Sequence, residues 1–305
     1  MPPRLVRDNG SAPTRPAATL QPTNEMQSNK TCYATPQHRA RIDHAGVTRI
    51  NRQVRRAWEL LYLLTFRELK LRYQDTFFGF LWSLIRPLLL GAVLFVVLRK
   101  FIRIDVPDYH LVLLSGLFPW TWFQTSLVVA VAAFASNGAL IKKVYFPRFV
   151  LPLATVLNNG VQYGFSIPVL ILLLLIGGYV PNWTWIIGIP YLVAVEAILI
   201  MGVVLFIASL DVYFRDLEHL TDVFVGLIWF YLTPVIYPLS IVPEKYHDLV
   251  LLNPMASLIE GWRGLFLHNQ LPGADLWPAL VFAAAIAAVG AFSFRSMEGG
   301  FADAL

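Results

Sequence analysis

The residues best suited to acid–base chemistry in this sequence are four carboxylates, Asp211, Asp216, Glu218 and Asp222, with His219 among them. A membrane-embedded glycosyl or acyl transferase would need a paired acid and base, or a metal site, at one membrane face. Beyond His219 the stretch offers no partner for such a pair. The sequence also lacks a G-x-x-x-x-G-K-[ST] phosphate loop, an H-E-x-x-H motif and a G-x-S-x-G motif. We therefore predict no catalytic residue and disfavour an enzyme.

Metal and cofactor chemistry finds equally little support in the residue types. The single cysteine, Cys32, can form neither an internal disulfide nor a zinc site, and the six histidines show no metal-ligand spacing. We predict no metal site and no cofactor in this chain. If the protein uses ATP, the ATP and its magnesium must bind to another chain.

A positively charged segment, Asn137 to Arg148, mixes bases with apolar residues. One interpretation is ordinary anchoring by positive charge at the cytoplasmic side. The other is a short helix that docks into a partner, with apolar anchors, bases facing an acidic surface, and Pro147 ending the helix. The candidate docking residues are Leu140, Ile141, Lys142, Lys143, Tyr145, Phe146 and Arg148.

Two ionisable residues fall inside apolar stretches, where a charge costs a few kcal/mol. Arg86 either extends to the inner membrane surface or faces a wet cavity where it meets an anionic headgroup. For Glu196 we favour an intramembrane hydrogen bond or a subunit contact over a proton relay. The reason is that no second carboxylate or histidine shares its stretch.

Aromatic residues are dense near the outer ends of two apolar stretches. They form either an interfacial belt or, since aromatic faces stack well against sugar rings, the wall of a glycan conduit. The conduit candidates are Phe118, Trp120, Trp122, Phe123, Trp229, Phe230 and Tyr231, with Tyr237 nearby.

The elements that must position these residues are membrane-spanning helices. Of 305 residues, 57% are hydrophobic and 14% are charged, where soluble domains carry about 25% charged residues. A spanning helix needs about 20 mainly apolar residues. The predicted fold is an all-α membrane protein with six spans, at about 77–98, 110–136, 152–177, 184–210, 221–240 and 277–294.

The positive charges predict the orientation of these spans. With the N-terminus in the cytoplasm, nineteen of the 24 lysines and arginines lie on the inner side and five on the outer side. Both termini are therefore expected in the cytoplasm. The group Arg99, Lys100 and Arg103 violates this rule, and the sequence offers no reason for it.

Three regions are not predicted to span. Residues 1–50 are rich in polar residues and proline, which predicts a disordered cytoplasmic tail. Residues 51–305 form the transmembrane domain, in which 55–75 is a basic amphipathic helix lying in the cytoplasmic interface. Residues 241–276 should re-enter the membrane from outside, with a short helix Pro254–Leu267 that begins after Asn253.

Several motifs together resemble the ABC-2-type permeases of polysaccharide exporters, such as the O-antigen, teichoic acid, capsule and galactan exporters. The run from Arg67 to Trp82, Arg-Glu-Leu-Lys-Leu-Arg-Tyr-Gln-Asp-Thr-Phe-Phe-Gly-Phe-Leu-Trp, resembles their N-terminal signature. Further matching positions are 118–123, 137–152, Arg215-Asp216, Asn253-Pro254 and Arg263. The resemblance covers about residues 55–300.

The resemblance implies a permease homodimer that pairs with two copies of a separate P-loop ATPase, and not an enzyme. The cargo would be a glycan on a polyprenyl pyrophosphate, moved across the bacterial plasma membrane. Carried over, Leu140–Phe146 would be the coupling helix and 241–268 the outer gate, including Asn253, Pro254 and Arg263, with Tyr237 beside it.

The lipid-pyrophosphate entrance is placed at the basic end of the interface helix. Its candidate residues are Arg67, Lys70, Arg72, Tyr73 and Arg86. Two other functions remain open, an ABC-2 exporter of a drug or small lipid and a membrane-embedded transferase. A secondary transporter is disfavoured, because no inverted repeat is evident.

Overall fold

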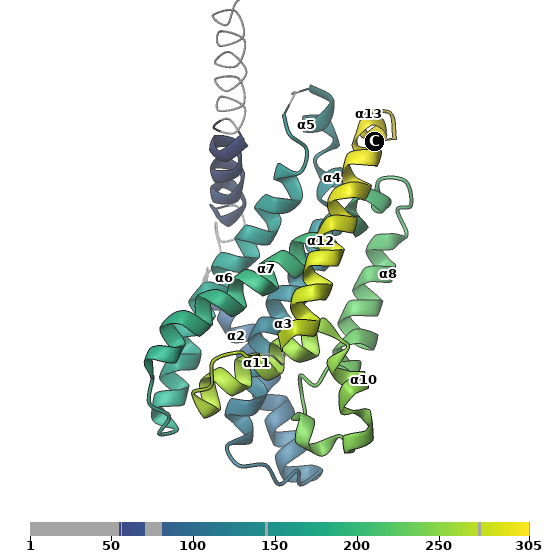
Figure 1. The fold of residues 1–305 in the computed structure, drawn as a ribbon. Coiled ribbons are helices and arrows are strands. Elements are labelled where there is room, and N and C mark those ends of the chain that lie inside the picture. The colour runs from purple at the N-terminus through teal and green to yellow at the C-terminus, as the bar shows by residue number, and fades with distance from the viewer. Residues whose placement is uncertain (1–54, 56, 71–80, 144–145, 274–275, 305) are drawn as a thin grey trace, which may run out of the picture. The chain divides into compact units, whose positions relative to one another are not determined.

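The computed structural model of the chain divides into two units, residues 1–50 and 51–305. The structure describes residues 55, 57–70, 81–143, 146–273 and 276–304. The tail predicted for 1–50 therefore lies outside the described residues. The second unit is all helical, with no strand among the residues described, and Figure 1 shows its elements.

Five helices are long and apolar enough to cross a membrane, which confirms five of the six predicted spans. These helices need no polar face, because lipid rather than water surrounds a helix that crosses a membrane. They are α2 (Leu81–Phe95) continued by the π-helix η1 (Val96–Phe101), α3 (Tyr109–Val131), α6 (Val150–Ile176), α7 (Trp183–Asp211) and α12 (Trp277–Met297) with η6 (Glu298–Gly300).

The structure does not confirm a sixth long span at 221–240. Three short segments follow one another there, α8 (Leu217–Val223), the π-helix η2 (Phe224–Trp229) and α9 (Phe230–Leu232). The helix ends at Thr233, whose backbone is extended, directly before Pro234. Proline disfavours the helical conformation in the residue before it, so the apolar run continues past the end of the helix.

The remaining helices are short and lie between the long ones. The predicted helix after Asn253 is confirmed as α11 (Pro254–His268), with the Asn253 side chain accepting a hydrogen bond from the Met255 N–H. The others are α4 (Ala133–Ser136), α5 (Gly138–Lys143), η3 (Leu239–Ile241), η4 (Glu244–Tyr246), α10 (His247–Leu251) and α13 (Phe301–Ala304).

Helix α3 is the most buried of the five long helices, because α2, α6, α7 and α11 pack around it. Helices α7 and α12 make the most extensive pairing in the unit, and they cross at two glycines, Gly202 and Gly290. A Cβ atom added at Gly202 would lie 2.6 Å from the Ala287 backbone nitrogen. Small residues of this kind allow two membrane helices to approach closely.

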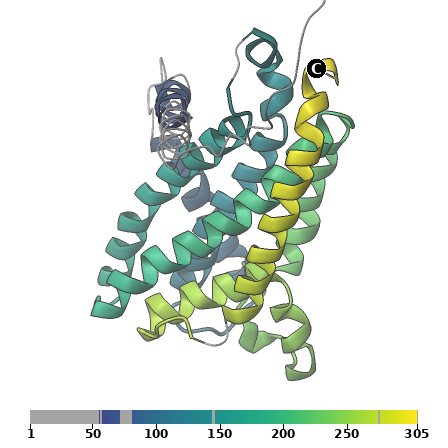
Figure 2. The ribbon, with the colours of Figure 1, turned by 45° about the horizontal axis from the view of Figure 1, so that its top comes forward.

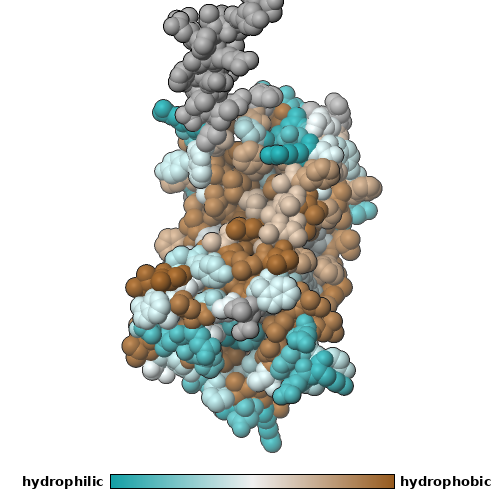
Figure 3. All heavy atoms as spheres, in the orientation of Figure 1, coloured by the Kyte–Doolittle hydropathy of each residue, from teal (hydrophilic) through white to brown (hydrophobic). Residues whose placement is uncertain are grey.

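One end of the unit gathers segments that are far apart in the sequence. Helices α4, α5 and α13 lie together there, and α10 lies at the opposite end (Figures 1 and 2). The hydrophobic cluster at this end joins Ile141 and Phe146 to Val212 and Phe301. On the face drawn in Figure 3, hydrophobic side chains cover the middle and hydrophilic ones gather mainly toward the lower end.

Candidate functional site

A cavity of about 600 Å³ lies between α2, α3 and α6, and Arg86 lines it. Pro87, the residue after Arg86, is buried, while Arg86 itself is exposed. From the sequence, this arginine could extend to the inner membrane surface or face a wet cavity. In the structure it lines a cavity. The polar side chains that line the same cavity are Ser83, Thr121, Thr125, Asn159, Gln162 and Ser166.

Aromatic side chains form another part of this cavity wall, beside Pro87, Leu89 and Val129. Trp82, Phe118, Trp122 and Tyr163 line it, and the last two stack with ring centroids 5.0 Å apart. One arginine, several hydroxyls and amides, and flat aromatic faces together suit a ligand with an anionic group and a polar or ring-bearing part. We name this space, with its lining residues, the Arg86 cavity.

Most of the predicted conduit aromatics pack inside this chain. The five buried ones are Phe118, Trp120, Trp122, Phe123 and Phe230. Trp120 packs against Phe230 at 5.6 Å between centroids, and Phe123 meets Trp229 edge to face at 5.0 Å. These pairs join α3 to the segment Phe224–Leu232. Of the seven, only Tyr231 is exposed, and only Phe118 and Trp122 line the Arg86 cavity.

Among the predicted outer-gate residues, Arg263 has a buried guanidinium that bonds to the backbone of Tyr237. Arg263, on α11, is only 4% exposed. Its Nη2 donates to the Val235 carbonyl at 2.8 Å, its Nη1 to the Tyr237 carbonyl at 3.1 Å, and its Nε to the Val112 carbonyl at 3.3 Å. One side chain thus ties α11 to α3 and to the turn after α9.

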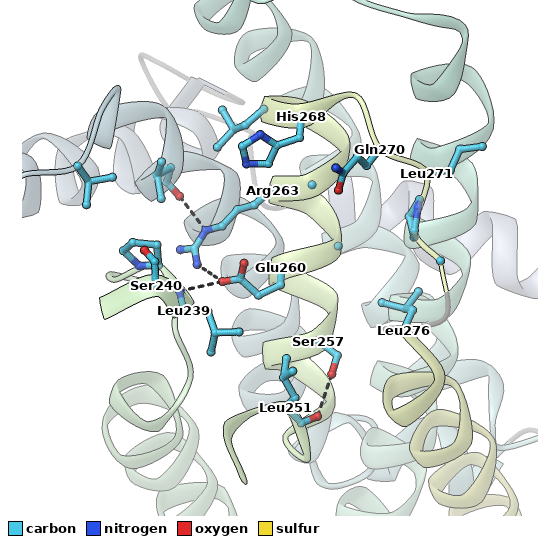
Figure 4. Close-up of a pocket in the computed structure, with 18 of the residues that line it drawn as sticks. Leu239, Ser240, Leu251, Ser257, Glu260, Arg263, His268, Gln270, Leu271 and Leu276 are labelled. Carbon is cyan, nitrogen blue, oxygen red and sulfur yellow. Dashed lines mark hydrogen bonds and ion pairs between the residues drawn. The ribbon is translucent and has the colours of Figure 1, made fainter. Parts of the chain in front are cut away.

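Glu260 supplies the counter-charge for this guanidinium. Its Oε1 lies 2.7 Å from Nη1 of Arg263, and the same oxygen accepts from the Leu239 N–H at 3.4 Å (Figure 4). A buried charge needs such a partner, together with hydrogen bonds, to be stable away from water. Sequence reasoning overlooked Glu260, although its i,i+3 spacing to Arg263 on a helix could have identified the pair.

Asn253 makes a second junction in the same region. Its Oδ1 accepts from the Trp229 indole N–H at 3.1 Å and its Nδ2 donates to the Thr233 hydroxyl at 2.7 Å. Asn253 and Arg263 therefore both bond to the segment Trp229–Tyr237. Their role as a gate stays a prediction.

A second cavity, of about 550 Å³, lies beside this junction. Glu260 and Arg263 line it together with His268 and Gln270, which come from the end of α11 and the loop that follows. Figure 4 shows these side chains around the cavity, with Ser240 beside Leu239. A cavity therefore adjoins the predicted gate segment, and its lining mixes charged and polar side chains with apolar ones.

Glu196 makes a hydrogen bond inside the protein, as we favoured from the sequence. Its Oε2 accepts from the Trp262 indole N–H at 3.1 Å, and both side chains are fully buried. The other oxygen, Oε1, has no hydrogen-bond partner among the residues that the structure describes. Sequence reasoning did not identify Trp262, because the contact joins positions 66 residues apart.

The predicted docking segment is only partly helical. Helix α5 covers Gly138–Lys143, and Tyr145 lies outside the described residues. Ile141 and Phe146 are buried in the cluster of their own chain, and Leu140 packs against it. Lys142 and Lys143 are exposed. The apolar residues therefore hold the segment in place, and the two lysines are what it presents outward.

Residues 57–70 form a helix that packs against the start of α6 through Leu61, Val150 and Ala154. Trp58, Tyr62 and Phe66 are exposed on it, as are Arg67 and Lys70. An exposed aromatic face beside bases is typical of a helix at a membrane surface. The predicted entrance residues Arg72 and Tyr73 lie outside the described residues.

Two residues of the basic group that violated the charge rule, Arg99 and Lys100, now have a local explanation. Arg99 and Lys100 lie in the last turn of η1, where a positive charge is favourable beside unpaired carbonyl groups. Arg99 also bonds to the Ile104 carbonyl at 2.7 Å and to Asp105 at 3.1 Å. The sequence could have indicated this placement, because basic residues are common in the last turn of a helix.

The chain is also similar in sequence to known transport proteins. The sequence profile of the ABC-2 type transporter family matches residues 59–267. An O-antigen export system permease protein of Klebsiella pneumoniae is 34% identical over 248 residues, which cover 81% of this chain and 95% of the relative.

Two further relatives come from other bacteria. An O-antigen export system permease protein of Myxococcus xanthus is also 34% identical, over 81% of this chain and 95% of its own length. A polysialic acid transport protein of Escherichia coli is 25% identical, over 79% and 93%. The chain therefore belongs to the ABC-2 type transporter family, as a multi-pass transport permease whose ATPase is a separate subunit.

Proposed function

We propose that this chain is the permease subunit of an ATP-driven exporter that moves a polyprenyl-pyrophosphate-linked polysaccharide across the bacterial plasma membrane. The observation that carries the proposal is the Arg86 cavity, which combines a cation, polar groups and aromatic faces within the apolar helices. The names of the relatives, which refer to O-antigen and polysialic acid, support a glycan cargo.

The chemistry of the cavity suits the junction between lipid and glycan. A pyrophosphate and a polar glycan cannot cross hydrocarbon unaided, because removing their polar groups from water costs too much free energy. The guanidinium of Arg86 would bind the pyrophosphate, as arginine binds phosphate groups with paired hydrogen bonds. Arg67 and Lys70 on the 57–70 helix, exposed near the start of α6, would attract the same anion to the membrane surface.

The proposed topology places both termini in the cytoplasm. Helix α5 and α13 share one hydrophobic cluster, so they lie on the same side, which requires an even number of crossings. The segment Leu217–Leu232 would supply the sixth crossing. At about 1.5 Å per residue it is about 24 Å long, and the turn that follows would extend it toward the 30 Å of a bilayer core.

The proposed assembly is a homodimer with two copies of a P-loop ATPase, which would bind ATP and magnesium. Residues Gly138–Arg148 would be the coupling segment, with Lys142 and Lys143 directed at the ATPase. Movement of this segment on ATP binding would change the packing of the helices between two arrangements. The buried contacts of Arg263 would then hold the outer gate closed in one of them.

A direct test is purification of the tagged chain from its host in mild detergent. A P-loop ATPase in equal amounts should come with it, and depletion of the chain should cause a lipid-linked glycan to accumulate on the inner membrane face. If the chain is isolated alone and no such glycan accumulates, the proposal is wrong.

One observation favours a second candidate, an ABC-2 exporter of a drug or small lipid. Three of the seven aromatics proposed for a glycan conduit, Trp120, Phe123 and Phe230, are buried in the core of this chain and do not line the Arg86 cavity, so they offer no free faces to sugars. Accumulation of a small lipid or drug instead of a glycan on depletion would select this candidate.

A further inference from the structure

The segment Glu298–Ala304 inserts one aromatic ring into the protein. Phe301 is fully buried. Its ring centroid lies 4.9 Å from that of Phe134, 5.9 Å from that of Phe294 and 6.3 Å from that of Tyr213. The ring therefore joins α4, α12 and the end of α7 at the side of the molecule that carries α5.

The same ring contacts the end of the proposed coupling segment. The guanidinium carbon of Arg148 lies 5.9 Å from the Phe301 ring centroid, within the range of a cation–π contact. An Arg148 Nη1 hydrogen also bonds to the Glu298 carbonyl. Arg148 is thus held from two sides by the segment that follows α12.

The start of the coupling segment meets the same cluster. Ile141 and Phe146 are buried in it with Phe301, and α13 contacts α5 directly. The Tyr213 hydroxyl donates to the Met297 carbonyl at 3.2 Å, which fixes the chain just before Phe301. Lys142 and Lys143 do not belong to this cluster and are exposed.

We propose that Phe301 is a positioning residue for coupling, and that with Arg148 it holds the described parts of the coupling segment, Gly138–Lys143 and Phe146–Arg148, in the geometry that docks on the ATPase. The inference rests on the proposed function, because that function makes this segment the docking site. Six residues of helix cannot hold a fixed position by themselves, since a helix this short is marginal without tertiary contacts. The Phe301 ring contacts Arg148 at the end of the segment, and the cluster that holds this ring also holds Ile141 near its start.

The first test measures how fast trypsin cleaves the coupling segment in the purified chain in lipid nanodiscs, with the wild-type chain as the reference. Trypsin cleaves after exposed lysines, so cleavage after Lys142 or Lys143 reports how often the segment opens, and cleavage after Lys245 at the other end is the internal reference. Phe301→Ala should accelerate cleavage at Lys142 and Lys143 by at least about tenfold, with Lys245 unchanged. Phe292→Ala is the matched control, because Phe292 is 77% exposed on α12.

The second test measures two properties of the complex with the ATPase: the amount of ATPase retained and the export per ATP hydrolysed. Phe301→Ala should lower the amount of ATPase retained on the permease and the rate of export per ATP hydrolysed, while Phe292→Ala should change neither. Phe301→Leu, which keeps apolar volume and removes the ring facing Arg148, should recover part of both. A residue with a purely structural role would change membrane yield and cleavage at Lys245 together.

The outcomes separate this inference from the proposed function. If the wild-type chain retains no ATPase, the proposed function is wrong, whatever the cleavage result. If the wild-type chain retains the ATPase and Phe301→Ala matches Phe292→Ala in cleavage and in ATP use, only the positioning role of Phe301 is wrong.

Discussion

Nε1 of Trp262 donates a hydrogen bond of 3.1 Å to Oε2 of Glu196, which joins the short helix α11 to the middle of α7. Trp262 also stacks on Phe266 at 5.4 Å between centroids and meets Tyr163 of α6 edge to face at 5.9 Å. The junction therefore connects the proposed gate helix to two of the long helices, with a carboxyl group at its centre.

The first prediction concerns this carboxyl group. Glu196→Gln should keep export and stability close to wild type, because an amide oxygen still accepts from the Trp262 N–H. Glu196→Leu should lower the free energy of unfolding by about 1–3 kcal/mol, because it leaves a buried donor unpaired. Thermal unfolding in detergent and an export assay measure both. Loss of export in Glu196→Gln with normal stability would indicate a proton relay instead.

The second prediction concerns the buried guanidinium of Arg263. Arg263→Gln should destabilise the gate by about 3–5 kcal/mol, because three carbonyl groups lose donors and Glu260 loses its counter-charge. Arg263→Lys should recover only part of this loss, since one ammonium group cannot reach carbonyls in three directions.

The measurement is cysteine labelling from the outer side. A Ser240→Cys probe in a Cys32→Ser background should react faster when Arg263 is replaced, because Ser240 lines the same cavity as Arg263 (Figure 4). Equal labelling rates in wild type and Arg263→Gln would contradict a role of this arginine in closing the gate.

The third prediction tests the Arg86 cavity. Arg86→Gln should reduce export strongly and leave the melting temperature unchanged, because Arg86 is exposed and its role is to bind the anion. Arg86→Lys should retain more activity, since it keeps the charge without the paired donors. Arg215→Gln is a suitable control, because that exposed arginine lies outside the cavity. Equal export by both glutamine variants would exclude Arg86 from substrate binding.

The fourth prediction concerns the crossing of α7 and α12. Gly202→Ala should destabilise the protein by about 1–3 kcal/mol, because the added Cβ would lie 2.6 Å from the Ala287 nitrogen and force the helices apart. Gly164→Ala is the matched control, since a Cβ there has no neighbour within 4 Å. The melting temperatures of the two variants should differ, and similar values would mean that the crossing adapts easily.

The fifth prediction concerns charge at the coupling segment. Replacing Lys142 and Lys143 with glutamate should lower the amount of ATPase retained, because both lysines are exposed and a basic surface favours an acidic partner. Lys245→Glu, at the other end of the molecule, should have no effect. Full retention of the ATPase by the double variant would show that these lysines do not contact it.

The amino-acid sequence by itself determined the membrane class, five spans and the family. Stretches of about 20 apolar residues have few alternatives to a spanning helix, so their identification needs no knowledge of neighbours. The start of α11 was also readable, because an asparagine cap followed by proline acts locally. The motif from Arg67 to Trp82, together with the other matching positions, was sufficient to identify the ABC-2 family.

Only the tertiary structure decided which residues meet. The contacts of Glu196 with Trp262 and of Arg148 with the Phe301 ring join positions far apart in the chain, and no local pattern specifies them. In an all-apolar helix such as α3 there is no polar face to show which side is inward. Burial of Trp120 and Phe123 in the core, and of Ile141 and Phe146 within the proposed coupling segment, therefore depended on helix packing that the sequence pattern does not encode.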